Sequence, residues 1–372
     1  MSGVTELFVG LMSGTSLDGV DGVLADFGAS RARVMAAASA DMPAALRAEL
    51  LALNTSGPDE LHRAALAGNA LMKVYAQVTQ ALLAQAGLEP AAVCAIGAHG
   101  QTVRHRPQEF DGTGYTLQLC QPALLAELTG VDVVADFRSR DVAAGGQGAP
   151  LAPFFHQAWL GTPGAVTGVL NIGGISNLTV LQTAKPLLGF DCGPGNALMD
   201  AWCQQHRGQP YDAQGAWAAS GQVDAALLAA CLADPFFARQ PPKSTGRDLF
   251  NAPWLAQRLS EAGALAPADV QATLAELTAR ACADAALQHA RELQRLVVCG
   301  GGALNDHLMS RLAALLPGVA VQSSAQVGLP PLQVEAAAFA WLARAAVRRD
   351  KLPLESATGA RGARVLGCVY PA

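Results

Sequence analysis

Several kinds of sequence feature are missing from this chain of 372 residues, and each absence excludes a class of protein. There is no run of about 18 apolar residues, so no membrane-spanning helix is expected. The N-terminus lacks a basic segment followed by a long apolar one, so no signal peptide is expected either. Lysine and arginine never form a run longer than two, and the net charge is -5. This balance argues against a nucleic-acid-binding surface. We therefore expect a cytoplasmic protein that binds neither nucleic acid nor membrane.

Well-known catalytic and metal-binding motifs are also absent. None of the four lysines, Lys73, Lys185, Lys243 and Lys351, completes the P-loop pattern G-x-x-x-x-G-K-[ST]. The chain contains no H-E-x-x-H and no G-x-S-x-G, and no cluster of Cys and His has zinc spacing. Its eight cysteines form no C-x-x-C pair, and most stand in apolar segments such as "LVVCGG". They are expected to be buried thiols in a reducing compartment.

The order of expected elements indicates an α/β protein with two related domains. Apolar strands alternate with helical patterns, and a length of 372 residues is typical of at least two domains. The opening pattern of strand, glycine-rich turn and strand recurs in "AVTGVLNIGGISNLTVL". We expect a first domain over 1–135, a second over 136–354, and a tail over about 355–372 that returns to the first. Clefts between such domains are common ligand sites.

The first glycine-rich turn, in "GLMSGTSLDGVDG", is a candidate phosphate site. Small residues let backbone N–H groups approach an anion, and hydroxyl groups add donors. A carboxylate beside a phosphate needs a cation between them, and Mg²⁺ prefers carboxylate, water and phosphate oxygens. Asp18 and Asp21 are the candidate metal ligands. The alternative is an ordinary hairpin turn.

Two further glycine-rich turns lie in the second half. "LNIGGISN" is a strand followed by Gly173, Gly174 and Ser176, which can hold a phosphate or simply close a hairpin. In "VVCGGGALNDHL" a triple glycine follows a buried strand and enters a helix. The dinucleotide-binding fingerprint fails there, because no acidic residue follows about twenty positions later. Gly300–Gly302 can instead form a flat floor for a base and ribose.

Two carboxylates and several polar strand ends complete the candidate residues. Asp191, in "GFDCGPGNALMDAW", precedes a rigid turn, where it is either a general base or a cap. Glu335 stands in a very apolar helix, so it is either a salt-bridged core residue or a substrate contact. Gln101, Thr102 and Arg138 follow expected strands and suit a hydroxylated ligand.

Together these segments resemble one known family. "GLMSGTSLDGVD", "IGAHGQT", "VVADFRSRDVAAGGQGAPL", "LNIGGISN", "GFDCGPGNALMDAW", "VVCGGGALN" and "SATGARGARVLG" resemble, in order, the signature segments of the anhydro-N-acetylmuramic acid kinases. The resemblance covers essentially the whole chain. It implies a two-domain ribonuclease-H-like, actin-like ATPase fold with an interdomain cleft that holds ATP. One departure follows "TLQ", where Cys120 and Gln121 replace an expected Gly followed by Asn or Asp.

The resemblance also implies a reaction in peptidoglycan recycling and amino sugar catabolism. Water opens the 1,6-anhydro bridge of 1,6-anhydro-N-acetylmuramic acid, and O6 takes the γ-phosphoryl group of ATP, giving N-acetylmuramic acid 6-phosphate and ADP. Asp191 is the expected base, Gln101, Thr102, Arg138 and Glu335 are expected to bind the sugar, and Arg138 or Arg140 its lactyl carboxylate. ATP with Mg²⁺ is expected at Gly14, Thr15, Ser16, Leu17, Asp18, Gly19, Val20, Asp21, Gly173, Gly174, Ser176, Gly300, Gly301 and Gly302.

Other interpretations remain open at the level of the sequence. A kinase of the same superfamily for another sugar or a small carboxylate would carry similar phosphate turns. A non-catalytic, nucleotide-dependent sugar sensor would keep those turns and could lose the base. The resemblance further implies a homodimer.

Overall fold

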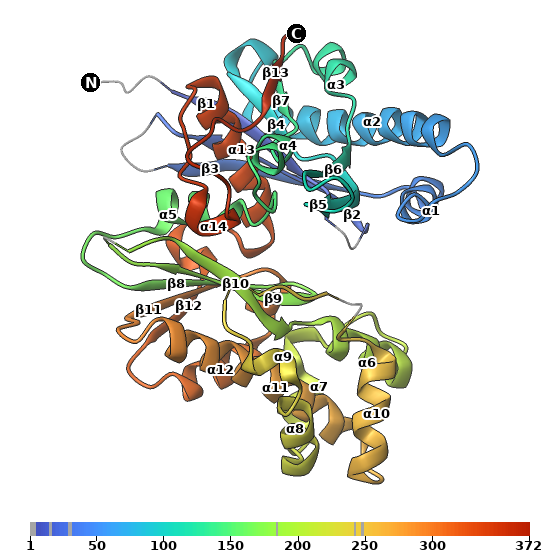
Figure 1. The fold of residues 1–372 in the computed structure, drawn as a ribbon, viewed down its shortest axis with the longest axis vertical. Coiled ribbons are helices and arrows are strands. Elements are labelled where there is room, and N and C mark those ends of the chain that lie inside the picture. The colour runs from blue at the N-terminus through green and yellow to red at the C-terminus, as the bar shows by residue number, and fades with distance from the viewer. Residues whose placement is uncertain (1–4, 15–16, 29–31, 184, 242, 247–248) are drawn as a thin grey trace. The chain divides into compact units, whose positions relative to one another are not determined.

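The chain forms two compact units (Figure 1). The structure, a computed structural model, describes residues 5–14, 17–28, 32–183, 185–241, 243–246 and 249–372. The first unit comprises Met1–Phe155 and Gln333–Ala372, and the second His156–Leu332. The predicted boundaries, after 135 and after 354, differ from these. Residues 136–155 and 333–354 belong to the first unit.

The first unit is built on a six-stranded sheet of order β13-β7-β4-β1-β2-β3. β1, β2 and β3 are antiparallel neighbours, whereas β4 and β7 are added parallel to β1 on its other side. The tail pairs antiparallel with β7 through β13. The elements are β1 (Leu7–Met12), β2 (Gly19–Asp26), β3 (Arg33–Asp41), α1 (Ala44–Ala52), α2 (Glu60–Ala86), β4 (Ala95–Ala98), β5 (Gln101–Pro107), β6 (Gly114–Leu119), α3 (Pro122–Thr129), β7 (Val133–Ala135), α4 (Ser139–Ala143), α13 (Val334–Val347), α14 (Glu355–Thr358) and β13 (Cys368–Tyr370). Helix α5 (Ala152–Leu160) begins in this unit and ends in the second.

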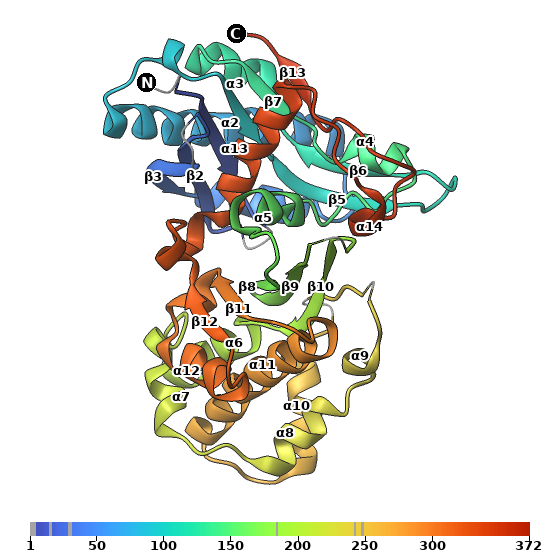
Figure 2. The same cartoon turned by 90° about the vertical axis from the view of Figure 1, so that its left-hand side faces the viewer.

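Helices α2 and α13 cover opposite faces of this sheet (Figures 1 and 2). A Cβ atom at Gly22 would meet Val78 of α2, whereas one at Gly10 would meet the backbone of α13 at Ala336. Gly97 of β4 is equally close to α13. The two strands therefore carry glycine where the helix backbone rests directly on them. This close packing explains why α13 belongs to the first unit, although it follows the second unit in the chain.

The second unit repeats the same topology in a five-stranded sheet of order β10-β9-β8-β11-β12. β8, β9 and β10 are antiparallel, and β11 and β12 are parallel to β8. Its elements are β8 (Thr167–Ile172), β9 (Ile175–Leu181), β10 (Leu188–Pro194), α6 (Ala197–Arg207), α7 (Ala216–Ser220), α8 (Ala225–Leu232), α9 (Pro235–Ala238), α10 (Ala252–Ala262), α11 (Pro267–His289), β11 (Arg295–Cys299), α12 (Asp306–Leu315) and β12 (Ala320–Ser323).

The repeated strand order identifies the fold. In each unit the first three strands form an antiparallel meander, and the next two strands of the sheet are added in parallel beside the first. This is the ribonuclease-H-like arrangement of the actin-like ATPases, so the α/β class and the duplication expected from the sequence are confirmed. The described helices include none that is long and apolar enough to cross a membrane. Five of the eight cysteines are buried, namely Cys192, Cys203, Cys231, Cys282 and Cys299.

Candidate active site

The first glycine-rich turn joins β1 to β2, as the sequence predicts. Thr15 and Ser16 lie outside the described residues. Leu17 N–H donates to the carbonyl of Gly14 at 3.2 Å, which closes the turn. The side chains of Leu17 and Val20 are buried in the core, so only their backbone groups are available to a ligand.

Gln101 lies against this turn, which links a predicted sugar-binding residue to the predicted phosphate site. Its Nε2 donates to the Gly14 carbonyl at 3.2 Å, and its side chain is almost fully buried. The amide oxygen Oε1 is buried and has no hydrogen-bond partner among the described residues. Because buried polar atoms are normally paired, this oxygen is available to a ligand donor. Thr102, next along β5, accepts a hydrogen bond from Gln118 at 3.2 Å.

Arg138 is held in a fixed orientation by His99 and Gly148. Its Nε and Nη2 atoms donate to Nε2 of His99 at 3.1 and 2.9 Å, and Nη1 donates to the Gly148 carbonyl at 2.8 Å. Burial, together with the charge of Arg138, lowers the pKa of His99 to about 3. The imidazole is therefore neutral and can accept from the guanidinium. A charged fork fixed in this way suits the recognition of a carboxylate.

Glu335 lies at the exposed start of α13. Burial of Arg138 lowers the pKa of its guanidinium to about 10, and the negative charge of Glu335 opposes this shift. No ion pair within 4 Å holds Glu335 among the described residues, so the salt-bridged core alternative is not supported. Arg140, the other residue considered for a carboxylate, is exposed in α4.

Asp18 and Asp21 are close enough to influence each other. Burial and, second, the charge of Asp18 raise the pKa of Asp21. A cation would relieve this repulsion, and Mg²⁺ is usually held by one or two carboxylates plus phosphate oxygens and water. The described residues contain no group of three or more His, Cys, Asp or Glu that could hold a metal alone. The pair therefore fits Mg²⁺ that is bound mainly through a nucleotide.

In the second unit, the turn between β8 and β9 is fastened to the turn that follows Asp191. Asn196 N–H donates to the carbonyl of Gly173 at 2.7 Å, and Gly195 N–H donates to that of Gly174 at 2.9 Å. Asn196 Nδ2 also donates to the Ile172 carbonyl at 3.2 Å. The structure thus brings together two motifs that the sequence singles out separately.

The triple glycine lies against the same turn. Gly300 has a φ of +74°, and a Cβ atom there would lie 2.5 Å from Asn171 Oδ1 and 2.6 Å from the Ile172 carbonyl oxygen. A Cβ atom at Gly302 would meet the Ile172 side chain, and one at Gly301 would lie 3.2 Å from Asn196 Nδ2. Glycine at these positions therefore allows the β11–α12 turn to pack closely against Asn171, Ile172 and Asn196.

The side chain of Ser176, a predicted phosphate ligand, forms hydrogen bonds with the backbone of β10. Its hydroxyl is fully buried and directed at the carbonyls of Gly193 and Pro194, at 3.1 and 3.2 Å. The single hydroxyl proton is therefore used to fasten β9 to β10. The structure does not favour the predicted phosphate contact for this side chain.

The segment that contains Lys243 and Thr245 forms hydrogen bonds with both the backbone and the carboxylate of Asp191. The Asp191 N–H donates to the Lys243 carbonyl at 3.1 Å, and Asp191 Oδ2 accepts from Thr245 N–H at 2.9 Å. Burial raises the pKa of the Asp191 carboxyl, against the opposing effects of the Thr245 N–H and the Lys243 charge. The N-cap of α6 is Asn196, so the cap alternative for Asp191 is not supported. Half-buried and fixed, the carboxylate suits a general base.

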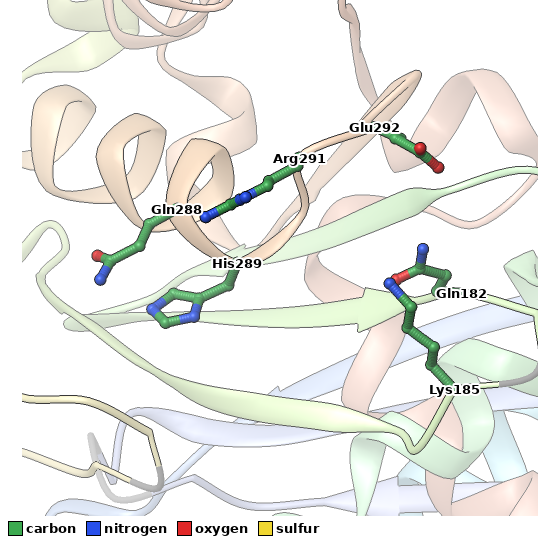
Figure 3. Close-up of a pocket in the computed structure, with 6 residues that line it drawn as sticks. All are labelled: Gln182, Lys185, Gln288, His289, Arg291 and Glu292. Atoms are coloured by element: carbon green, nitrogen blue, oxygen red, sulfur yellow. The ribbon is translucent and has the colours of Figure 1, made fainter.

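Sequence reasoning missed Lys243 and Thr245. The only local signal is "PPKSTGRD", which combines one of four lysines with small hydroxyl residues and a glycine. A separate pocket of about 300 Å³ lies at the end of α11 (Figure 3). It contains no predicted site residue and is lined by Gln182, Lys185, Gln288, His289, Arg291 and Glu292.

The fold and these sites together define the class of protein. Two ribonuclease-H-like units with glycine-rich hairpins, paired aspartates and a fixed carboxylate are the features of an actin-like phosphotransferase. A family model described as anhydro-N-acetylmuramic acid kinase matches residues 6–372. The chain belongs to the anhydro-N-acetylmuramic acid kinase family, and it is a kinase.

Two relatives of known family agree with this assignment. The chain is 65% identical to the anhydro-N-acetylmuramic acid kinase of Variovorax paradoxus, over 99% of each chain. It is 61% identical to that of Albidiferax ferrireducens, over 99% of this chain and all of the relative. Among solved structures it is similar to component A of the (R)-2-hydroxyglutaryl-CoA dehydratase of Acidaminococcus fermentans, at 13% identity and a TM-score of 0.49, covering 90% of this chain and 96% of the other. Membership of a kinase family supports the use of ATP, and no comparison supports the alternative functions.

Proposed function

We propose that the protein opens the 1,6-anhydro bridge of 1,6-anhydro-N-acetylmuramic acid with water and phosphorylates O6 with ATP. The products are N-acetylmuramic acid 6-phosphate and ADP, and the pathway is peptidoglycan recycling. The printed names of the relatives support the substrate. The observation that carries the chemistry is Asp191, whose carboxylate is half-buried, oriented by Thr245 and raised in pKa.

The chemistry of the substrate determines what this base must do. O6 is tied into the bridge, so there is no O6 hydroxyl to deprotonate. Asp191 instead takes a proton from water as the water oxygen attacks C1, as in an inverting glycosidase. The C1–O6 bond breaks, its electron pair goes to O6, and O6 attacks the γ-phosphorus of ATP. The β–γ bridging oxygen leaves with ADP. A pKa raised towards neutrality makes the carboxylate a stronger base.

The other residues have binding roles in this proposal. The turn from Gly14 to Asp21 and the pair Gly173 and Gly174 offer backbone groups to the ATP phosphates, and Gly300–Gly302 offers a surface to adenosine. Asp18 and Asp21 would hold Mg²⁺, and a bound Mg²⁺ would neutralise part of the negative charge of the phosphates.

On the sugar side, Gln101 offers to a hydroxyl group its amide oxygen, which has no partner among the described residues. Arg138 offers its fixed guanidinium to the lactyl carboxylate. Thr102 and Glu335 are further sugar contacts in this proposal. A homodimer and a cytoplasmic location, which the family resemblance implies, belong to the same proposal.

The test is an ADP-release assay with ATP, Mg²⁺ and the anhydro sugar, with products identified by mass. The expected product is heavier than the anhydro sugar by one water and one phosphoryl group. Asp191→Asn should lower the rate by about 10²- to 10⁴-fold, the usual contribution of a general base. Binding of an ATP analogue should be retained. Turnover of ordinary N-acetylmuramic acid or glucose in place of the anhydro sugar would overturn the proposal, as would an Asp191→Asn enzyme with full activity.

A further inference from the structure

Thr245 lies beside Asp191 and presents two polar groups there, its backbone N–H and its side-chain hydroxyl. Its backbone N–H donates to Asp191 Oδ2 at 2.9 Å. Its own hydroxyl oxygen Oγ1 is buried and has no hydrogen-bond partner among the described residues. Buried hydroxyl groups are normally paired, so among the described residues this oxygen has acceptor capacity left for a ligand or a water molecule. The nearest chemical event in the proposed function is the activation of water by Asp191.

The position of Thr245 is fixed by more than this one hydrogen bond. The same segment receives the Asp191 N–H at the Lys243 carbonyl, at 3.1 Å. The Lys243 ammonium lies over the Phe236 ring, 4.7 Å from its centroid, and 3.5 Å from the carbonyls of Phe236 and Phe237. The segment is thus attached to β10 and to α9. A hydroxyl carried on such a segment is held at a constant position relative to the carboxylate.

An attacking water needs two acceptors to be oriented. It has two protons and two lone pairs, and only a lone pair can attack C1. One proton points at the Asp191 carboxylate, which removes it. If the second proton points at another acceptor, the remaining lone pairs have a fixed direction. Thr245 Oγ1 has acceptor lone pairs to offer, whereas its backbone N–H is already engaged with Oδ2.

We propose that Thr245 Oγ1 is the second acceptor for the attacking water and directs its lone pair at C1. This inference rests on the proposed function, because it takes Asp191 as the base. The proton that leaves the water goes to Asp191, and the proton directed at Thr245 stays on the new C1 hydroxyl. Thr245 therefore orients the nucleophile and exchanges no proton with it.

The experiment compares Thr245→Val with Thr245→Ser. Valine has the shape of threonine and keeps the backbone N–H, but it has no acceptor. We expect the turnover of the anhydro sugar to fall about 10- to 100-fold in Thr245→Val, the effect of losing one orienting hydrogen bond on a reacting group. Thr245→Ser should retain most of the activity. Ser244→Ala is the matched control, because Ser244 is the exposed neighbour on the same segment and should leave the rate unchanged.

A second readout separates orientation of water from a general structural effect. Methanol has one O–H proton, so it can satisfy Asp191 but not Thr245 as well. In mixtures of water and methanol, the wild-type enzyme should favour water, and the ratio of methyl glycoside to hydrolysed product should rise in Thr245→Val. A structural defect would lower both products in proportion. If Thr245→Val fails to bind an ATP analogue, Thr245→Ala is measured in the same two assays.

The outcomes distinguish the two proposals. A wild-type rate for Thr245→Val, or a lower rate with an unchanged product ratio, would overturn the role of Thr245. If Asp191→Asn is inactive in that case, the proposed base stands and only this inference fails. If Asp191→Asn remains fully active, the proposed function itself fails, and with it the role given to Thr245.

Discussion

Arg138 donates two hydrogen bonds to a single atom, Nε2 of His99, at 3.1 and 2.9 Å. An imidazole nitrogen accepts in this way only when it carries no proton, so the His99 proton resides on Nδ1. That Nδ1 atom is buried without a partner among the described residues. The pair therefore forms a rigid polar unit in which the orientation of the guanidinium is set by a neutral histidine.

We predict that Arg138→Lys weakens sugar binding while it leaves nucleotide binding intact. Lysine keeps the positive charge but cannot donate in a planar fork to both His99 and a carboxylate. The expected loss in kcat/KM for the anhydro sugar is about 10- to 100-fold, expressed mainly in KM. Steady-state kinetics with the sugar varied, and titration with an ATP analogue, measure the two effects. Arg47→Lys is the control, because Arg47 is exposed on α1 and has no role in the proposed site. An unchanged KM in Arg138→Lys would remove Arg138 from the sugar site.

Much of the fold follows from local sequence signals. The glycine-rich turns predict the hairpins β1–β2 and β8–β9, and the helical pattern from about Asp59 to Ala86 predicts α2, which the structure shows at Glu60–Ala86. Gly87 ends that helix with a φ of +64°. Such features depend on neighbouring residues, so the sequence reveals them directly.

The remaining features depend on contacts between distant parts of the chain. Helix α13 is apolar, and its sequence does not say which sheet it covers. Gly10 and Gly97 of the first sheet leave room for the backbone of α13. Thr245 is 54 positions from Asp191, and no local pattern connects them. Ser176 carries a hydroxyl in a motif that resembles a phosphate turn, but its side chain faces β10. Alternation along a strand decides such a direction, and a one-residue difference reverses it.

The pH dependence of the reaction provides a second prediction. Asp191 acts as a base only when it is deprotonated, and burial raises its pKa above the ordinary value of 3.8. Activity should therefore fall on acidification at a higher pH than an ordinary aspartate would give. The charge of Lys243 opposes this rise, so Lys243→Met should raise the pKa of Asp191 further.

The acidic limb of the kcat/KM profile should accordingly move to higher pH in Lys243→Met. Lys185→Met is the control, since Lys185 is exposed on the loop before β10. A limb that stays in place, or moves to lower pH, would contradict the electrostatic role of Lys243.

A third prediction compares two glycines with similar backbones and different surroundings. Gly300 and Gly318 have φ values of +74° and +84°, so alanine is strained at both. A Cβ atom at Gly318 meets nothing within 4 Å, whereas one at Gly300 lies 2.5 Å from Asn171 Oδ1. Gly318→Ala should cost about 1–2 kcal/mol of unfolding free energy, and Gly300→Ala about 1–3 kcal/mol more. Gly300→Ala should also raise the KM for ATP. Urea unfolding measures the free energy of unfolding, and steady-state kinetics measure the KM for ATP. Equal losses of unfolding free energy in the two variants would mean that the atoms around Gly300 shift to accommodate the Cβ atom at little cost.

The last prediction concerns acid stability in the second unit. Glu276 is buried in α11 and accepts from Arg311 at 2.7 and 3.2 Å and from Arg280 at 2.8 Å. Burial alone would raise the pKa of Glu276, but these hydrogen bonds and charges outweigh it and lower the pKa below 4.5. A carboxyl group whose pKa is lowered in the folded state stabilises the fold at pH values above its unfolded pKa. This stabilisation disappears as the pH falls through the folded pKa.

Glu276→Gln should therefore lose about 1–3 kcal/mol of unfolding free energy at neutral pH, and the difference from wild type should shrink below about pH 4.5. Chemical unfolding across this pH range measures the effect, with the exposed Glu261→Gln as control. A difference that is constant with pH would show that Glu276 acts through its shape and not through its charge.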